Sequence, residues 1–538
     1  FCFAALEQKL STPDYNATIT LTEEGKIVTS LSYPEGDICI CRDHKERISE
    51  IVYPDNSSLS YSYTDNRTDL FFDSSSHTFS LSLFYDSYGR VVKQLFPQGI
   101  TAEFLWDSSS HLLKATYTKN EEEPFLAIDL VYSGNLLIKK KLCFKEGEKE
   151  YLYTYDEKDR LSSVMCTTGE EEHFVYDTNG NCIQHSHKNK LEEEETSFVY
   201  NSHHQLILAT NRDNIPFSYD EKGNCILQGD RIYSYTHNLL SSVQDPWQEE
   251  TYRYDISHNW IGAKNREGEK LFFFQDLTVD PSNCLAIKKN DSSLILYGYA
   301  PHLFFCKEED SLLFFIPDFP HKSPLFAFTI EGDLALPTSY RTWGKSSVAS
   351  PIGYNQQQTA FSGHLLYMHQ RFYDTSTGRF LTPDPVIEEH PYLYARANPL
   401  AWQDPLGTES VSIHVEVPKK VTRWTLGEGW DWGHGWISLK MADGSVFYCG
   451  AHPEGIKEEQ EDRKPAATVT FEITEEQTKK VQEILTEFKD YQFFTNNCID
   501  LITRVLDACE IKHPPFKAVG LVSSPNKLYR WIVERDPE

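Results

Sequence analysis

A short motif built around Tyr-Asp recurs between residues 83 and 261 and constrains the fold more than any other feature of the chain. Clear copies are LFYDSYGRVV (83–92), YTYDEKDRLS (153–162), FVYDTNGNCI (174–183), FSYDEKGNCI (217–226) and YRYDISHNWI (252–261). Weaker copies are FLWDSSSHLL (104–113), FVYNSHHQLI (198–207) and YSYTHNLLSS (233–242). From Tyr155 onward the aligned tyrosines follow at 176, 200, 219, 235 and 254, about 20 residues apart. A drifting period of this length predicts a repeated supersecondary unit that buries its apolar face only against stacked neighbours.

Each copy is typical of a β-hairpin. Aromatic and polar residues alternate before the turn, which is the period of a half-buried strand. The Asp can accept hydrogen bonds from backbone N–H groups of the turn, and the Gly or Asn that follows tolerates a positive φ. Aromatic residues make up 13% of the chain, a composition that favours strands. We therefore predict a mostly β chain; the alternative to a repeat shell is a generic β-meander.

These segments resemble the tyrosine–aspartate (YD) repeats of Rhs (rearrangement hotspot) proteins and of the C component of insecticidal toxin complexes. The stretch AFSGHLLYMHQRFYDTSTGRFLTPDPVIEEHPYLYARANPLAWQDPLG (360–407) is similar to the terminus of the Rhs core. The resemblance covers most of residues 30–407. It implies a β-hairpin ribbon wound into a cocoon-like shell (1–359), a core terminus (360–407) and a C-terminal payload (408–538). The repeats are fewer than a large closed cocoon uses, which implies a shell that is small, incomplete or truncated at its start.

Two Asp-Pro pairs, at Asp384 and Asp404, lie 20 residues apart in the core terminus. In several Rhs-type proteins a corresponding pair forms an aspartyl autoprotease, so the resemblance implies self-cleavage near residues 407–409. Two carboxylates that share a site split their pKa values, so that one serves as acid and the other as base. Ile387 and Thr408 depart from the family pattern, which usually has Gly and Leu there. The alternative is that both aspartates only begin Asp-Pro turns.

The repeat ends after Gly407, and residues 408–538 predict a small α+β domain. Alternating apolar residues predict strands over 411–417, 434–441, 446–452 and 467–473. A helix is expected over 475–489, where Thr474 and Gln477 form a capping box, and another from Ser524 onward. Between them a helix is expected to begin near Cys498, and its core face to hold Leu501, Ile502, Val505 and Leu506.

Cys498, in FFTNNCIDLITRV, stands at the expected N-terminus of that helix. The helix dipole and the free N–H groups there lower the pKa of a thiol and make it nucleophilic. His434 begins one expected strand and His452 ends the next, so we expect them near one another, and a histidine can pair with the thiolate. The competing interpretation is that Cys498 is a core thiol, as Cys509 is expected to be. Cys449 is a rival nucleophile that lacks a helix terminus.

The motifs GHGWISL, YCGAHPEG, NNCIDL and SPNKLYRW resemble those of the circularly permuted papain-like NlpC superfamily, which includes lecithin retinol acyltransferase-like enzymes. The resemblance implies that Cys498 is the nucleophile, His434 the general base and His452 the orienting third residue. Asn497 or the backbone N–H of Cys498 would then help to stabilise an oxyanion. Other candidates for the third residue are Asp431, Asp443 and a backbone carbonyl.

We therefore expect a Rhs-type toxin whose cysteine hydrolase or acyltransferase attacks an amide or ester bond of a target-cell protein or of peptidoglycan. No metal or organic cofactor is implied. The resemblance implies an immunity protein and secretion machinery as further partners, and secretion or delivery into a target cell. One alternative is a cell-surface adhesion or recognition protein with a non-catalytic C-terminal domain, since teneurins carry similar repeats. Another is that Cys498 forms a thioester or a mixed disulfide with a partner.

Composition narrows the remaining classes of function. The formal net charge of −29 argues against a nucleic-acid partner, because phosphate binding needs a basic surface. The 12 cysteines include no CxxC pair and no zinc-ligand spacing, so most are expected to be reduced core residues. No apolar run reaches the roughly 20 residues that span a bilayer. The chain opens on Phe1 rather than Met, so we expect an upstream segment that would hold any secretion signal.

Overall fold

The structure, a computed structural model, describes residues 6–11, 16–21, 27–43, 47–145, 147–255, 258–276, 283–290, 293–300, 302–335, 338–348, 350–384, 390–401, 410–416, 434–440, 446–452, 455–458, 467–472, 480 and 505. The chain divides into two compact units. Unit 1 consists of Phe1–His44, Ile48–Pro383 and Tyr392–Gly407. Unit 2 consists of Lys45–Arg47, Asp384–Pro391 and Thr408–Glu538.

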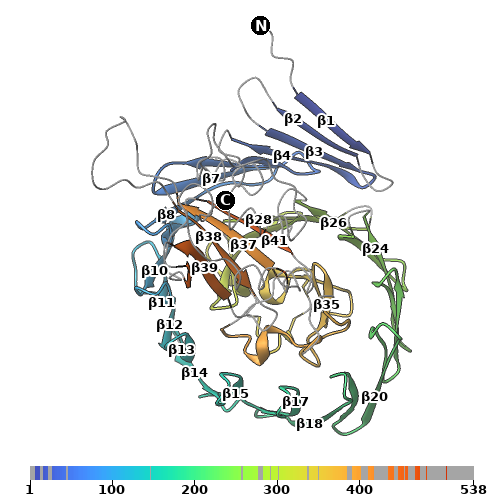
Figure 1. The fold of residues 1–538 in the computed structure, drawn as a ribbon. Coiled ribbons are helices and arrows are strands. Elements are labelled where there is room, and N and C mark those ends of the chain that lie inside the picture. Colours follow the sequence, from blue (N-terminus) through green and yellow to red (C-terminus); the bar gives the residue numbers. More distant parts are fainter. Residues whose placement is uncertain are drawn as a thin grey trace. The chain divides into compact units, whose positions relative to one another are not determined.

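Unit 1 is dominated by one 32-stranded antiparallel sheet. Every described strand of this sheet pairs with the next along the chain, from β1–β2 through β19–β20 to β31–β32, so the sheet is a continuous ribbon of hairpins. In Figure 1 the strands from β8 to β26 follow one another along a curve, with β35 on its concave side. The expectation of a mostly β chain built from a ribbon of hairpins is confirmed.

The first half of this sheet contains the following strands: β1 Leu6–Ser11, β2 Asn16–Leu21, β3 Ile27–Tyr33, β4 Gly36–Arg42, β5 Ile48–Val52, β6 Ser58–Tyr63, β7 Arg67–Asp73, β8 Thr78–Tyr85, β9 Val91–Leu95, β10 Ile100–Trp106, β11 Leu112–Lys119, β12 Leu126–Ser133, β13 Leu136–Phe144, β14 Gly147–Tyr155, β15 Leu161–Cys166 and β16 Glu171–Tyr176. One short 3-10 helix, η1 Pro97–Gly99, connects β9 to β10.

The second half continues with β17 Cys182–Lys188, β18 Glu193–Tyr200, β19 Leu206–Thr210, β20 Asn214–Tyr219, β21 Cys225–Gln228, β22 Arg231–Thr236, β23 Leu239–Gln244, β24 Glu249–Tyr254, β25 Trp260–Asn265, β26 Lys270–Gln275, β27 Cys284–Lys289, β28 Ser293–Tyr299, β29 Leu303–Glu308, β30 Ser311–Asp318, β31 Ser323–Thr329 and β32 Leu334–Ala335. A second, 4-stranded sheet follows: β33 Gln358–Thr359, β34 Leu365–Met368, β35 Arg371–Asp374 and β36 Arg379–Phe380. The 3-10 helices η2 Tyr354–Gln356 and η3 Ala395–Ala397 flank it.

The YD turn has the hydrogen bonds that its sequence predicts. In YTYDEKDRLS, Oδ1 of Asp156 accepts from the backbone N–H of Lys158 at 2.9 Å and from that of Arg160 at 3.0 Å. The N–H of Asp156 donates in turn to the carbonyl of Arg160 at 2.9 Å. Asp159 adopts a φ of 59°, and Gly223 takes the same place in its own copy with a φ of 85°. The turn therefore needs a left-handed residue, which glycine provides with little strain.

The motif tyrosine ties each hairpin to the one before it. The register shifts at a β-bulge between Val175 and Tyr176, and the Tyr176 hydroxyl donates to the carbonyl of Leu161 at 2.8 Å. The guanidinium of Arg160, in the preceding copy, lies 4.6 Å from the centre of the Tyr176 ring. Equivalent bonds of 2.6 to 2.9 Å join Tyr155 to Leu137, Tyr200 to Cys182, Tyr235 to Cys225 and Tyr254 to Leu240.

Strands near the end of the large sheet are buried on both faces. In β26, Phe272 and Phe274 pack against Tyr33 of β3, with ring centroids 5.1 and 5.6 Å apart. Phe273, between them, faces the other way and packs against Trp260 at 4.5 Å. One face of these strands therefore lies on the N-terminal strands, and the other contributes to a separate core with β34 and β35. Burial on both sides explains the run of aromatic residues without alternation.

The core terminus packs along a row of YD turns. Three of its side chains donate hydrogen bonds to backbone carbonyls at the left-handed positions of three different turns. The pairs, donor first, are Asn398 to Asp159 at 2.8 Å, Arg379 to His204 at 2.6 Å and Tyr392 to Gly223 at 2.7 Å. The N–H of Cys225 also donates to the carbonyl of Leu381 at 2.8 Å. This segment is thus a structural partner of the repeats.

Unit 2 contains a 5-stranded antiparallel sheet in the order β40-β39-β38-β37-β41. Its strands are β37 Ser410–Glu416, β38 His434–Lys440, β39 Val446–His452, β40 Gly455–Glu458 and β41 Ala467–Glu472. Four of them agree with the predicted strands to within a residue or so, whereas β40 was not predicted. Lys480 and Val505 are helical, and Val505 is buried as expected. The rest of the three expected helices lies outside the described residues. No helix in the described part of the chain is long and apolar enough to span a bilayer.

Candidate functional site

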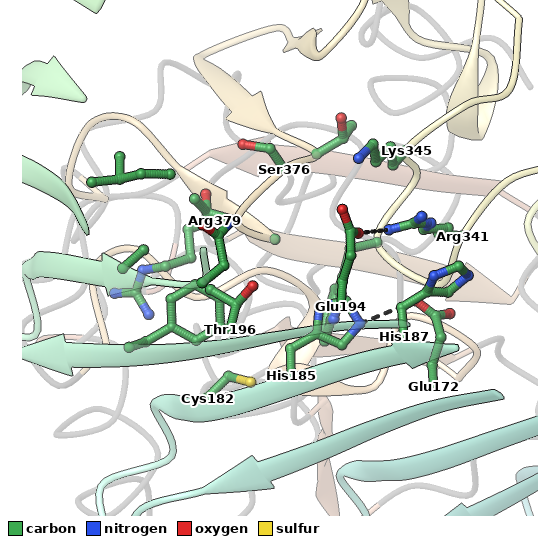
Figure 2. A pocket seen from close by; sticks show the side chains of 18 of the residues that line it. Glu172, Cys182, His185, His187, Glu194, Thr196, Arg341, Lys345, Ser376 and Arg379 are labelled. Carbon is green, nitrogen blue, oxygen red and sulfur yellow. Dashed lines mark hydrogen bonds and ion pairs between the residues drawn. The ribbon is translucent and has the colours of Figure 1, made fainter. Parts of the chain in front are cut away.

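A polar cavity of about 180 Å³ lies in unit 1, between strands β16 to β18 and the segments 341–345 and 375–379. Figure 2 shows acidic and imidazole side chains on the strands, with Arg341, Lys345 and Ser376 opposite them. The wall on the strands carries Glu172, His185, His187 and Glu194. Groups of opposite charge therefore meet across the cavity.

Strand pairing sets these side chains in rows. Glu172 on β16 is opposite His187 on β17, which is opposite Glu194 on β18. Two residues earlier on β17, His185 is opposite Phe174 on β16 and opposite Thr196 on β18. Because side chains alternate between the faces of a strand, both rows share one face of the sheet. Directly opposed residues in a row have Cβ atoms about 5 Å apart, which allows their polar groups to interact.

The carboxylate of Glu172 is buried and hydrogen bonded through both oxygens. Oε1 lies 3.1 Å from Nε2 of His185, and Oε2 accepts from the N–H and the hydroxyl of Thr342 at 3.0 and 2.5 Å. Burial raises the pKa of Glu172, but the bonds from His185 and Thr342 outweigh it and leave that pKa below its ordinary value. The His185 ring also stacks on Phe174, with centroids 4.6 Å apart. These contacts hold the His185 imidazole and the Glu172 carboxylate in one relative orientation.

His187 is 2% exposed, and neither ring nitrogen has a hydrogen-bond partner. Nε2 lies 3.6 Å from Oε1 of Glu170, which is too long for a hydrogen bond. Nearby, Arg341 donates to Glu192 at 2.9 Å and to Glu194 at 3.1 Å. The bond from Arg341 holds the pKa of Glu194 below its ordinary value. The cavity thus contains two ionised carboxylates, those of Glu172 and Glu194, and the imidazole of His187, whose ring nitrogens make no hydrogen bond.

The other residues that line the cavity include no activated nucleophile. Burial raises the pKa of the Cys182 thiol to about 12, so the thiol is protonated at neutral pH. Arg379 is engaged with the carbonyl of His204 and lies 4.8 Å from the centre of the Tyr200 ring. Within the part of the chain that the structure describes, no hydroxyl or thiol hydrogen bonds to His185. The arrangement is suited to binding a charged group rather than to covalent catalysis.

The predicted catalytic histidines lie on adjacent strands of unit 2. His434 is the first residue of β38, and His452 is the last of β39. The last pair of the β38–β39 ladder is Trp436 opposite Gly450. Continued by two residues, this register aligns His434 with His452, so the expected proximity of the two positions agrees with the backbone. Cys498 and Asn497 lie outside the described residues, so their roles remain predictions.

The predicted autocleavage pair is only partly described. Asp384 is 6% exposed, and its N–H donates to the carbonyl of Pro391 at 2.7 Å. Asp404, together with residues 405–409, lies outside the described residues. A buried carboxyl is compatible with either an acid–base role or a turn, so self-cleavage stays a prediction.

The cavity in unit 1 was not predicted from the sequence. A signal was present: Glu170 and Glu172, His185 and His187, and Glu192 and Glu194 are each two residues apart, with Glu170 and Glu192 directly before their strands. This pattern places polar residues on a face that YD repeats otherwise fill with aromatic and aliphatic side chains. Arg341 had no such signal, because it follows Glu194 by 147 positions and meets it only in the folded chain.

Residues 137–399 match the family model described as Teneurin YD-shell. Teneurin-3 of Mus musculus is 27% identical over 249 residues, which is 44% of this chain and 9% of that protein. Teneurin-1 of Gallus gallus is 25% identical over 254 residues, 45% of this chain and 9% of that protein. The chain thus corresponds to less than a tenth of the length of these curated relatives.

Solved structures with a similar backbone path include the crystal structure of TcdB2-TccC3 without its hypervariable C-terminal region. The TM-score is 0.40 at 13% identity, over 72% of this chain and 27% of that one. The Photorhabdus luminescens Tc holotoxin pore gives a TM-score of 0.40 at 11% identity, over 72% and 26% of the two chains. The hairpin geometry of the described repeats and the family match together support a YD-repeat shell over residues 137–399 of this chain.

Proposed function

We propose that this YD-repeat shell protein is a toxin whose C-terminal domain, residues 408–538, is a cysteine hydrolase or acyltransferase. Cys498 is the nucleophile, His434 the general base and His452 the residue that orients His434. Asn497 helps to stabilise the oxyanion. The proposed substrate is an amide or ester bond in a target-cell protein or in peptidoglycan, and the chain is secreted or delivered to reach it.

The backbone register of β38 and β39 is the observation that carries this proposal. Its last pair is Trp436 opposite Gly450, and the same register continued by two residues would align His434 with His452. Opposed residues of an antiparallel pair have Cα atoms about 5 Å apart, within reach for one imidazole to orient another. A helix that begins at Cys498 would supply a thiol with a lowered pKa.

The proposed reaction divides into two acyl transfers. The Cys498 thiolate attacks the carbonyl carbon, and the bond to the leaving nitrogen or oxygen breaks as protonated His434 donates its proton to that atom. The acyl group is then held as a thioester on Cys498. Water, or a second acceptor, gives its proton to His434 and attacks the thioester, which restores the thiolate and releases the product.

Alkylation of the full-length chain tests the nucleophile. With iodoacetamide at pH 7, Cys498 is expected to react at least ~10-fold faster than Cys509, because only a thiolate attacks the reagent. Peptide mass mapping against time gives both rates in one sample. The variant His434→Ala is expected to reduce the difference, since only the contribution of the helix N-terminus then remains. Equal rates for the two cysteines in the wild-type chain would contradict an activated Cys498.

Growth of a surrogate host that expresses the full chain tests the activity. Toxicity is expected to disappear in Cys498→Ala and to persist in the matched control Cys509→Ala, at equal protein levels. Loss of the nucleophile of a catalytic unit typically lowers the rate by about 10³-fold or more. Toxicity that survives Cys498→Ala would rule out the cysteine mechanism.

Self-cleavage near residues 407–409 is part of the same proposal, with Asp384 and Asp404 as the acid–base pair. The intact mass of the purified chain checks it directly. Two fragments are expected in the wild type and one full-length species in Asp384→Asn. A wild-type chain that stays full length for days would exclude cleavage.

A cell-surface adhesion or recognition protein is the second candidate, and the Teneurin YD-shell match favours it. In that case the shell would do the binding, and the C-terminal domain would be catalytically silent. The two candidates differ in the alkylation experiment, since an adhesion protein has no reason to activate Cys498.

A further inference from the structure

We propose that the cavity of unit 1 binds a divalent transition-metal ion such as zinc, held by His187, Glu192 and Glu194. One ligand atom of each residue lies within 4.8 Å of those of the other two. Imidazole nitrogen and carboxylate oxygen are ligands that zinc and its neighbours in the periodic table accept. Metal–ligand bonds of about 2.1 Å require the three atoms to close in by roughly 1 Å around one ion.

The buried imidazole is the observation that distinguishes this cluster from an ordinary surface group of acids. His187 is 2% exposed and has no hydrogen bond at Nδ1 or Nε2. Buried ring nitrogens are nearly always satisfied by protein or by an ordered partner. Figure 2 shows the side chains of His187 and Glu194 rising from neighbouring strands toward the same side of the cavity. An ion between them would satisfy one of the two nitrogens.

Arg341 is compatible with this ion. It contacts Oε1 of Glu192 and Oε2 of Glu194, so each carboxylate keeps its other oxygen for the metal. Groups that hydrogen bond to metal ligands orient them and tune their affinity for the ion. The bond from Arg341 also keeps Glu194 ionised at neutral pH, which is the form that ligates.

The charges around the cavity also favour a cation. Oε1 of Glu170 lies 3.6 Å from Nε2 of His187 and adds negative charge beside the three ligands. Three carboxylates, those of Glu170, Glu192 and Glu194, lie near His187, and one guanidinium, that of Arg341, pairs with the last two. A divalent ion would be attracted by this local excess of negative charge. The metal site is independent of the cysteine chemistry proposed for unit 2.

Titration of the full-length chain with zinc tests the proposal. The protein, without a histidine tag, is stripped with EDTA, desalted and titrated with Zn²⁺ in a calorimeter. Wild type is expected to bind one equivalent of zinc. The variants His187→Gln and Glu194→Gln are expected to bind that equivalent at least 10-fold more weakly. His173→Gln is the matched control, because His173 is half exposed, on the opposite face of β16, and it should retain the equivalent.

Glu192→Gln guards against a folding defect in the buried variants. Glu192 is exposed, so its substitution leaves the core intact. Glu192→Gln is expected to weaken zinc binding and to abolish the rise in melting temperature that zinc gives the wild type. Co²⁺ separates this site from the 12 cysteines of the chain, because thiolate ligands give a strong charge-transfer band and N/O ligands do not. Zinc binding that is absent in the wild type, unchanged in His187→Gln and Glu192→Gln, or thiolate-like with Co²⁺ would overturn the proposal.

Discussion

The guanidinium of Arg379 donates a hydrogen bond of 2.6 Å to the backbone carbonyl of His204, the left-handed residue of a YD turn. The same guanidinium lies 4.8 Å from the centre of the Tyr200 ring and 5.6 Å from that of Tyr392. A residue of the core terminus therefore holds the end of a hairpin that lies 175 positions earlier. Within unit 1, the core terminus thus packs directly on the repeats.

Replacing Arg379 is expected to destabilise unit 1. Arg379→Lys keeps the positive charge but removes the planar guanidinium, which donates hydrogen bonds and stacks on aromatic rings at the same time. The free energy of unfolding is expected to fall by about 2 kcal/mol, measured by denaturant titration. The control Arg253→Lys changes a side chain that is 42% exposed in its pair with Glu35, and it should cost less than about 1 kcal/mol. Equal effects of the two substitutions would contradict the role of Arg379.

Two glycines at equivalent turn positions separate backbone strain from packing. Gly223 has a φ of 85°, and a Cβ there would lie 2.7 Å from the hydroxyl oxygen of Tyr392; Gly89 has a φ of 74° with nothing within 4 Å. Gly89→Ala is expected to cost about 1 kcal/mol for its backbone conformation alone. Gly223→Ala is expected to cost about 3 kcal/mol, because Tyr392 must also move. Thermal unfolding of both variants measures the difference, and similar losses would mean that Tyr392 does not pack on this turn.

The motif tyrosines are expected to stabilise the ribbon through their hydroxyls. Tyr254 donates to the carbonyl of Leu240 at 2.7 Å in a partly buried position. Tyr254→Phe keeps the ring and removes this bond, which is expected to cost about 1 kcal/mol. Tyr88→Phe, at a ring 62% exposed, should change stability by no more than about 0.5 kcal/mol. A neutral Tyr254→Phe would show that the bulge alone sets the register.

Acid is expected to weaken unit 1 through buried histidines. Burial lowers the pKa of His321 to about 4, with Asp318 opposing the shift and Lys140 adding to it. The unfolded chain has an ordinary histidine pKa near ~6.5, so between these values it binds one more proton than the folded chain. Stability is therefore full above about pH 6.5 and falls toward pH 4, by up to about 3 kcal/mol for this residue.

Denaturant titrations of the wild type and of His321→Gln at pH 7 and pH 5 measure this effect. The variant is expected to lose less stability between the two pH values than the wild type does. His203→Gln, on an exposed turn, should leave the pH dependence unchanged. Parallel curves for the wild type and His321→Gln would mean that other groups carry the acid sensitivity.

Local features of the chain were predictable from its sequence. The YD motif determines a hairpin because Asp156 satisfies the N–H groups of Lys158 and Arg160 within four residues. The strands of unit 2 followed from their period of two, except for β40, whose four residues are too few to show a pattern. The pairing of each strand with the next also followed, since short turns leave no other partner.

Contacts across the ribbon were decided only by the tertiary structure. Nothing in the phenylalanine run of β26 indicates that Phe272 and Phe274 meet Tyr33 while Phe273 meets Trp260. The cavity depends in the same way on Arg341, which reaches Glu194 across 147 positions. The motifs determine each hairpin through bonds between near neighbours. How far the ribbon curves, and so which distant residues meet, depends on the accumulated twist and bulges of many strands, which no single segment encodes.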